Sequence, residues 1–206
     1  MNTENAARVA AACIAAVAWA GLALQGIVVY QENSSVLLTL WILLAFFTIT
    51  TNLLVAVVFT GIAMNRAVFR SAWVVAGTML SILLVGVIYA LLLHGLTELS
   101  GGSAVANVLV HMVTPVVVPL FWIFFVVKGR LTWRNPLLWA IYPLAYLAYG
   151  LTRGTITGKY PYPFMDVLSL GWQKTAINSF WIAVAFMLCS FAIVWIDHRL
   201  GTRTAV

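Results

Sequence analysis

The chain has 206 residues, of which 64% are hydrophobic and 8% are charged, and its formal net charge is +6. Soluble domains carry about 25% charged and about 45–50% apolar residues, so this composition excludes a soluble globular protein and a disordered chain. The basic residues stand in short clusters between long apolar runs, which excludes a nucleic-acid-binding surface and is typical of a protein that crosses a membrane several times.

Six apolar runs are expected to cross the membrane as helices, since a helix needs about 20 apolar residues to span the hydrocarbon. They cover residues 9–29, 37–62, 73–93, 105–127, 137–152 and 176–196. The first run is longer than the apolar part of a typical signal peptide, which favours a retained helix over a cleaved one. The sequence therefore predicts an all-α integral membrane protein, with residues 1–206 forming a single bundle of six transmembrane helices.

Positive charge is divided unequally between the two sides of this predicted bundle. Eight of the eleven Lys and Arg residues fall on the side that holds both chain ends, namely Arg8, Arg66, Arg70, Lys128, Arg130, Arg134, Arg199 and Arg203. The other side holds Arg153, Lys159 and Lys174. Because Lys and Arg stay in cytoplasmic loops, both termini are predicted to be cytoplasmic.

The second apolar run contains a cluster of polar residues in the stretch FFTITTNLLV. Thr48 and Asn52 are four residues apart and share one helix face, Thr51 lies beside that face, and Thr50 points away from it. Polar side chains at membrane depth cost free energy, so such a cluster is a candidate functional site. The alternative is a structural role, in which the threonines bond to their own helix and the asparagine joins two helices.

The fourth apolar run carries a histidine beside a proline, in the stretch NVLVHMVTP. Pro115 has no N–H to donate to the carbonyl of His111, so we expect a free carbonyl and a kink at the histidine. His111 is expected about 9 Å inside the outer end of its run, and Thr48 within about one helical turn of that depth. A hydroxyl beside an imidazole is the minimal activated nucleophile, which this spacing permits and does not require.

The fifth apolar run has a stripe of tyrosines on one helix face. Tyr142, Tyr146, Tyr149 and Arg153 follow one another at offsets of four, three and four residues, and the stripe ends in a cation at the outer interface. One interpretation is a polar wall that leads to a guanidinium able to bind a carboxylate. The other is an interfacial anchor, with the tyrosines packed in the bundle.

The only long connection is expected at residues 153–175, on the outer side. It contains the run Tyr160-Pro161-Tyr162-Pro163-Phe164, in which the two prolines fix φ and the aromatic rings favour the membrane interface. The run predicts a stiff cap over the outer end of the bundle, or an aromatic anchor at that interface.

The remaining reactive side chains point to no metal site and no cofactor. Cys13 and Cys189 both lie in apolar runs, where a free cysteine acts as a small packing residue. Cys, His and carboxylate side chains do not cluster at ligand spacing. Two other classes of function stay open: a haem-binding redox protein with His94 and His111 as axial ligands, and a non-enzymatic protein that binds or transports a small polar solute.

Four stretches together resemble the bacterial Pr6Pr family of six-helix membrane proteins: FFTITTNLLV, LVHMVTP, WRNPLLWAIYPLAYLAYGLTRG and TGKYPYPFMDV. This family is similar to the eukaryotic androgen-induced gene 1 and androgen-dependent TFPI-regulating proteins. Those are membrane hydrolases that cleave fatty acid esters of hydroxy fatty acids with an intramembrane threonine and a histidine. The resemblance extends from the second run to the outer loop after the fifth, and it implies a multi-pass protein of the bacterial cytoplasmic membrane.

By this resemblance, Thr48 corresponds to the threonine nucleophile of the family and His111 to its histidine. The function that we expect is an intramembrane hydrolase whose partners are the lipid bilayer and an apolar lipid ester, with no nucleic acid. Thr48 is the expected nucleophile, His111 its base, and Asn52 a donor to the oxyanion or an orienting residue. The expected substrate-binding residues are Arg153, Tyr146, Tyr149, Tyr160, Tyr162 and Phe164.

Overall fold

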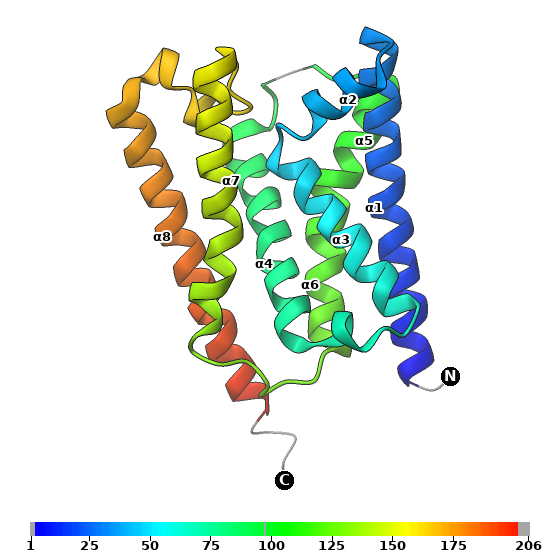
Figure 1. Cartoon of the computed structure of the whole chain (residues 1–206). Helices are drawn as coiled ribbons and strands as arrows, with labels where there is room; N and C mark the ends of the chain where they lie inside the picture. The colour runs from blue at the N-terminus through cyan, green and yellow to red at the C-terminus, as the bar shows by residue number, and fades with distance from the viewer. Residues whose placement is uncertain (1–2, 97, 202–206) are drawn as a thin grey trace. The chain divides into compact units, whose positions relative to one another are not determined.

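The regular secondary structure of residues 3–96 and 98–201, which the computed structural model describes, is helical throughout and includes no strand (Figure 1). The prediction of an all-α protein is therefore confirmed for these residues. The chain separates into two compact units, residues 1–128 and residues 129–206. A single bundle built from both units stays a prediction, because it concerns how one unit packs on the other.

The first unit contains most of the helices. Its elements are α1 (Thr3–Asn33), α2 (Val36–Leu43), α3 (Phe47–Ala63), the 3-10 turn η1 (Ala67–Arg70), α4 (Ala72–Ile88), the π-helical turn η2 (Tyr89–Leu93), α5 (Gly101–Val108), the π-helical turn η3 (Leu109–Val113) and α6 (Thr114–Phe125). The second unit contains α7 (Asn135–Thr157), the 3-10 turn η4 (Pro163–Met165) and α8 (Val167–Gly201).

Four helices of the described chain are long and apolar enough to cross a membrane, as expected of a multi-pass membrane protein. They are α1, α4 continued by η2, α5 continued through η3 into α6, and α8; the bent pair of α2 and α3 makes a fifth if it counts as one span. Helix α7 is 23 residues long but does not belong to this set. Six crossings and cytoplasmic termini therefore stay predictions.

The second predicted span is not one continuous helix. Helix α2 ends at Leu43, α3 begins at Phe47, and the two are bent by 98°. The break at residues 44–46 contains neither glycine nor proline, the residues that most often interrupt helices. Val29 of α1 packs with Leu43 and Ile49 in one buried apolar cluster, so the bend is held by tertiary contacts rather than by a helix-breaking residue.

The predicted long connection at residues 153–175 is much shorter in the structure, because the flanking helices extend into it. Helix α7 continues to Thr157, whose hydroxyl donates to the carbonyl of Arg153, and it ends at Gly158 with a φ of 68°. Helix α8 begins at Val167 and is kinked at Gly171, whose φ of 76° and ψ of 160° are not helical, so the connection before its first turn covers only residues 158–166. Threonines are poor helix formers in isolation, but here a hydroxyl satisfies a carbonyl of the last turn.

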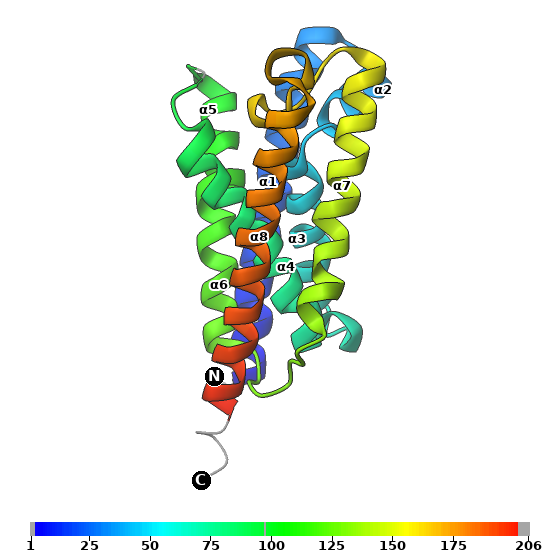
Figure 2. The ribbon, with the colours of Figure 1, turned by 90° about the vertical axis from the view of Figure 1, so that its left-hand side faces the viewer.

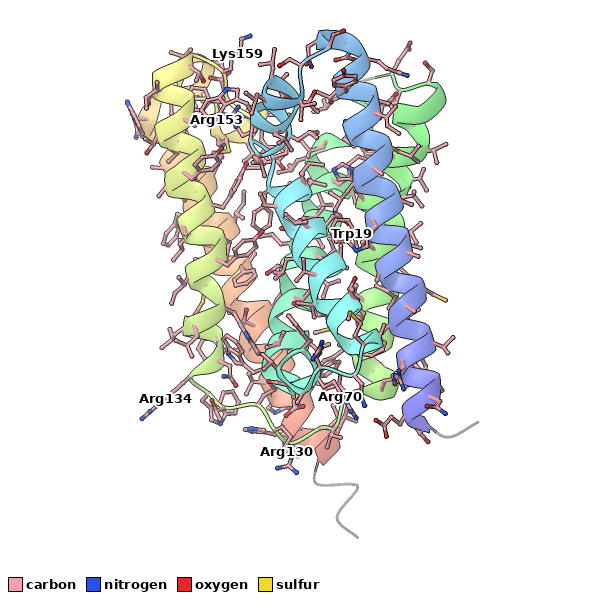
Figure 3. The ribbon with its side chains drawn as sticks, turned by 45° about the vertical axis from the view of Figure 1, so that its right-hand side comes forward. Trp19, Arg70, Arg130, Arg134, Arg153 and Lys159 are labelled. Carbon is pink, nitrogen blue, oxygen red and sulfur yellow. The ribbon has the colours of Figure 1, made fainter. Side chains whose placement is uncertain are left out.

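Helix α1 packs against several other helices of the first unit. It contacts α3, α5 and α6, and its buried side includes Ala11, Ala18 and Gly21, small residues that allow helices to approach closely (Figure 1). The indole Nε1 of Trp19 donates to Thr60 Oγ1 of α3 at 3.2 Å (Figure 3).

Basic residues mark one end of the first unit. Arg8 of α1 donates to the carbonyl of Ala63 at the end of α3, and Arg70 pairs with Glu4 at 3.1 Å. The start of α1 therefore lies beside the connection between α3 and α4. Arg8 and Arg70, which the charge bias assigns to one side of the membrane, therefore lie at the same end of this unit, whereas the identity of that side stays a prediction.

In the second unit, α7 and α8 pack against each other as two long helices (Figure 2). Arg130 and Arg134 lie at the end where α7 begins, and Arg153 and Lys159 lie at the opposite end (Figure 3). A hydrogen bond joins the segment before α7 to α8: the fully buried carboxylate of Asp197 accepts the backbone N–H of Leu131 at 2.9 Å.

Candidate active site

Thr48 and His111 meet inside the first unit. The hydroxyl oxygen of Thr48 lies 3.2 Å from Nε2 of His111, although the two residues are 63 positions apart in the sequence. The Thr48 side chain is buried, with 5% of its surface exposed, and His111 is partly exposed. The structure thus brings together the two residues that the sequence predicts as nucleophile and base, at hydrogen-bond distance.

Thr48 lies in the first turn of a helix, because the bend between α2 and α3 makes it the second residue of α3. The sequence predicted a position well inside a longer helix, and nothing in Leu44-Ala45-Phe46 indicates a break. The difference matters chemically. A helix N-terminus carries a partial positive charge that favours negative charge placed next to it, and a threonine alkoxide or an oxyanion develops such a charge.

His111 lies in the middle of the π-helical turn η3. The backbone N–H of Thr114 donates to the carbonyl of Leu109, five residues earlier, instead of to Val110. Pro115 has no N–H for the carbonyl of His111. The proline therefore marks the irregularity correctly, but the helix responds with a π-helical turn, a feature often found at functional sites.

The carbonyl of Val110, released by the π-helical turn, is satisfied from another helix. The amide nitrogen of Asn52 donates to it at 3.0 Å and to the carbonyl of Thr48 at 2.9 Å. The Thr114 hydroxyl donates to the amide oxygen of Asn52 at 2.8 Å. Asn52 is fully buried and uses both amide hydrogens on carbonyls, which favours the orienting role over that of an oxyanion donor.

The neighbouring threonines do not share the position of Thr48. The Thr50 hydroxyl donates to the carbonyl of Phe47 in its own helix at 3.1 Å, in keeping with the prediction that it points to another face. Thr51 is fully buried beside the network. Thr48 is the threonine whose hydroxyl lies at hydrogen-bond distance from His111.

Tyr89 is a site residue that the sequence reasoning missed. Its ring stacks on the imidazole of His111, with 4.4 Å between the ring centroids and 25° between the planes. Its hydroxyl lies 2.6 Å from the amide nitrogen of Asn107 and 3.3 Å from Nδ1 of His94. A lone tyrosine near the end of an apolar run is usual at a membrane interface, so its position gave no signal.

Two glycines let the neighbouring helices approach η3 closely. A Cβ on Gly86 of α4 would lie 2.6 Å from Cβ of Pro115, and a Cβ on Gly21 of α1 would lie 2.7 Å from a methyl of Val110. Such distances are too short for carbon atoms in contact. The absence of a side chain at Gly21 and Gly86 therefore fixes how near α1 and α4 come to the turn that carries His111.

The predicted substrate-binding residues all belong to the second unit. The guanidinium of Arg153 donates to the Tyr149 hydroxyl at 3.0 Å, and the rings of Tyr146 and Tyr149 lie 6.2 Å apart. This part of the stripe on α7 is confirmed as one contiguous surface. Its relation to Thr48 and His111 stays a prediction.

The aromatic run after α7 forms a packed cap on that helix. The ring of Tyr160 lies directly over Gly154, where a Cβ would be 2.1 Å from a ring carbon. Tyr162 and Phe164 stack with 5.2 Å between their centroids and 7° between their planes. The amide of Asn178 on α8 donates to the carbonyl of Phe164 at 3.0 Å. The stiffness predicted from the two prolines is thus reinforced by packing.

The histidines are not arranged as a pair of haem ligands. His94 and His111 both contact the ring of Tyr89, and Nε2 of His111 already bonds to Thr48. Haem coordination would require both imidazole nitrogens to face one iron. Among the residues that the structure describes, no group of three or more His, Cys, Asp or Glu side chains could hold a metal ion.

Comparison of the chain with known families, with curated proteins and with solved structures gives no match. The resemblance to the Pr6Pr family therefore stays a proposal. The functional argument rests on the contacts of Thr48, Asn52 and His111 themselves.

Proposed function

We propose that this protein is an intramembrane threonine hydrolase that cleaves an apolar lipid ester. The observation that carries the proposal is the distance of 3.2 Å between Thr48 Oγ1 and His111 Nε2 in the interior of an apolar helical unit. A hydroxyl is a weak nucleophile until a base accepts its proton, and here the base is within hydrogen-bond distance. The resemblance of four stretches to the Pr6Pr family points to the same function.

In the proposed reaction, Thr48 attacks the ester carbonyl while Nε2 of His111 accepts the hydroxyl proton. The tetrahedral intermediate collapses as His111 returns this proton to the leaving alkoxide, which departs as an alcohol. Water then attacks the acyl-threonine with His111 again as base, releasing a carboxylic acid and restoring the Thr48 hydroxyl. This is the threonine and histidine version of the acyl-transfer mechanism of serine hydrolases.

The surroundings of the pair suit this chemistry. For Nε2 to accept a proton, the neutral imidazole must carry its hydrogen on Nδ1. The N-terminal turn of α3 favours the negative charge of the intermediate, and Asn52 holds that turn against the turn of His111.

The same proposal assigns the second unit to substrate binding. Arg153 would bind a free carboxylate, as in a fatty acid ester of a hydroxy fatty acid, beside Tyr146 and Tyr149. Tyr160, Tyr162 and Phe164 would cap the acyl chains. The protein would cross the bacterial cytoplasmic membrane six times with both termini inside, so that the ester enters from the lipid.

The test is labelling of the purified protein in lipid nanodiscs with a fluorophosphonate probe, followed by mapping of the modified residue. We expect modification of Thr48 and its loss in Thr48→Ala. The matched control is Thr50→Ala, which removes a hydroxyl bonded to its own helix and should label like the wild type. Undiminished labelling of a folded Thr48→Ala protein, or no labelling of the wild type, contradicts the proposal.

A further inference from the structure

We propose that Tyr89 is the positioning residue for His111, holding the imidazole by ring stacking in the place of the acidic residue that orients the histidine of a catalytic triad. The inference rests on the proposed function, since it assigns His111 the role of base. It adds to the proposed site the helix formed by α4 and η2, and a residue outside the motifs that suggested a hydrolase.

The imidazole nitrogen of His111 that faces away from Thr48 is Nδ1. In a catalytic triad, a carboxylate accepts the N–H of Nδ1 and so fixes the tautomer and orientation of the ring. Here, Nδ1 of His111 is buried and no described side chain bonds to it. The backbone of Asn107, one helical turn earlier, interacts with the ring. A single backbone contact leaves the imidazole able to turn about that contact, so a second group is required to hold the plane of the ring.

The stacked ring of Tyr89 meets that requirement. Its centroid lies 4.4 Å from that of His111 and its plane is inclined by 25°, so rotation of the imidazole about its χ2 angle would drive its edge into the tyrosine. Aromatic faces also carry partial negative charge, which favours the imidazolium that forms when Thr48 gives up its proton. Stacking thus supplies both orientation and stabilisation of the charged base.

Tyr89 is itself fixed at both ends. Its hydroxyl lies 2.6 Å from the amide nitrogen of Asn107, which belongs to the same helix as His111, and 3.3 Å from Nδ1 of His94. Its backbone carbonyl accepts the N–H of His94 at 2.8 Å, five residues on, which closes the π-helical turn η2. Two π-helical turns on neighbouring helices therefore present the two stacked rings to each other.

The experiment compares Tyr89→Leu, which removes the ring, with Tyr89→Phe, which keeps the ring and removes the hydroxyl. The chain has three histidines, so nitrogen-15 NMR of histidine-labelled protein can be assigned with single substitutions of His94 and His198. We expect one tautomer of His111 in the wild type, protonated at Nδ1, with ring protons shifted upfield by the tyrosine. Tyr89→Phe should keep the single tautomer and the upfield shift but broaden the signals, because the bond to Asn107 is lost. Tyr89→Leu should show both tautomers without the upfield shift.

The kinetic arm uses hydrolysis of a neutral long-chain p-nitrophenyl ester. We expect Tyr89→Leu to lower kcat about 100-fold with little change in KM, since a small displacement of a catalytic group has an effect of this order. Tyr89→Phe should lose about fivefold or less, the effect of one hydrogen bond. The control is Tyr30→Leu, because Tyr30 is 44% exposed on α1 and should leave kcat unchanged.

The outcomes separate this inference from the proposed function. A single His111 tautomer and full turnover in Tyr89→Leu overturn the inference and leave the hydrolase proposal intact. The opposite outcome is also informative. If the His111 tautomer changes in Tyr89→Leu, but the wild-type protein neither reacts with the fluorophosphonate probe nor hydrolyses esters, the hydrolase proposal is overturned and positioning by Tyr89 is supported.

A second variant covers the case in which Tyr89→Leu does not fold. Asn107→Ala leaves both rings in place and removes the side chain that tethers the Tyr89 hydroxyl. It should lower kcat about fivefold and broaden the His111 signals. Unchanged kcat and unchanged signals in Asn107→Ala then overturn the inference.

Discussion

The two units contain pairs of polar residues with the same spacing and opposite surroundings. Thr48 and Asn52 are four residues apart on α3, fully or almost fully buried, and bonded to each other and to η3. Tyr149 and Arg153 are four residues apart on α7, with Tyr149 40% exposed, and they bond to each other on one helix. Spacing therefore identifies neighbours on a helix, whereas burial and a contact with a second helix distinguish a fixed site from a surface pair.

Substitution of Thr48 and His111 should have the largest effect on ester hydrolysis, and it tests whether the two side chains act as one unit. We expect Thr48→Ala and His111→Gln each to lower ester hydrolysis by about 1,000-fold or more, and the double variant to be no slower than either. The measurement is kcat/KM in nanodiscs for the wild type, the two single variants and the double variant. Additive losses would show that the two side chains act independently and would contradict the proposed mechanism.

Removal of Asn52 tests whether the buried network fixes the site. Asn52→Leu removes the amide that bonds to the carbonyl of Val110 and to the hydroxyl of Thr114, which then keep only their bond to each other at 3.2 Å. The change should lower the free energy of unfolding by about 1–3 kcal/mol and hydrolysis by about 100-fold.

The matched change in the second unit is Tyr149→Phe, which breaks the exposed bond to Arg153 and should alter the free energy of unfolding by less than about 0.5 kcal/mol. Both values come from equilibrium unfolding in detergent. Equal losses of unfolding free energy in Asn52→Leu and Tyr149→Phe would show that the buried pair is no more important for stability than the exposed pair.

The close contact at Gly86 tests the helix spacing without altering any polar group. Gly86→Ala puts a methyl 2.6 Å from Pro115 and should move α4 away from η3, lowering hydrolysis about tenfold. Gly26→Ala is the control, because a Cβ there meets nothing within 4 Å. Kinetics and thermal stability are measured for both. Wild-type kcat in Gly86→Ala would show that the site does not depend on this approach.

The smallest effect is expected at Arg153. Arg153→Ala removes a partly exposed guanidinium, so KM for an ester with a free carboxylate should rise by about fivefold or less while kcat stays unchanged. The control is the methyl ester of the same substrate, whose KM should not change. A large fall in kcat for both substrates would place Arg153 in the chemistry instead of in binding.

The sequence predicted the helical class, the extent of most apolar runs, and the pair Thr48 and His111. These features follow from local rules: long apolar runs form helices in a membrane, and polar residues within them carry a cost that demands partners. The break at residues 44–46, the π-helical turns and Tyr89 could not be predicted, because packing between helices decides them. The connection after α7 was predicted too long, because α7 continues to Thr157 and α8 begins at Val167.

The break between α2 and α3 also decides how the chain responds to a change in length. In a continuous helix, one inserted residue rotates every later side chain by about 100° about the axis. The interruption at residues 44–46 absorbs such a rotation, because two bonds of α3 itself set its rotation about the helix axis: Asn52 donates to η3, and Thr60 accepts from Trp19. We therefore expect Thr48 to keep facing His111 when α2 gains or loses one residue.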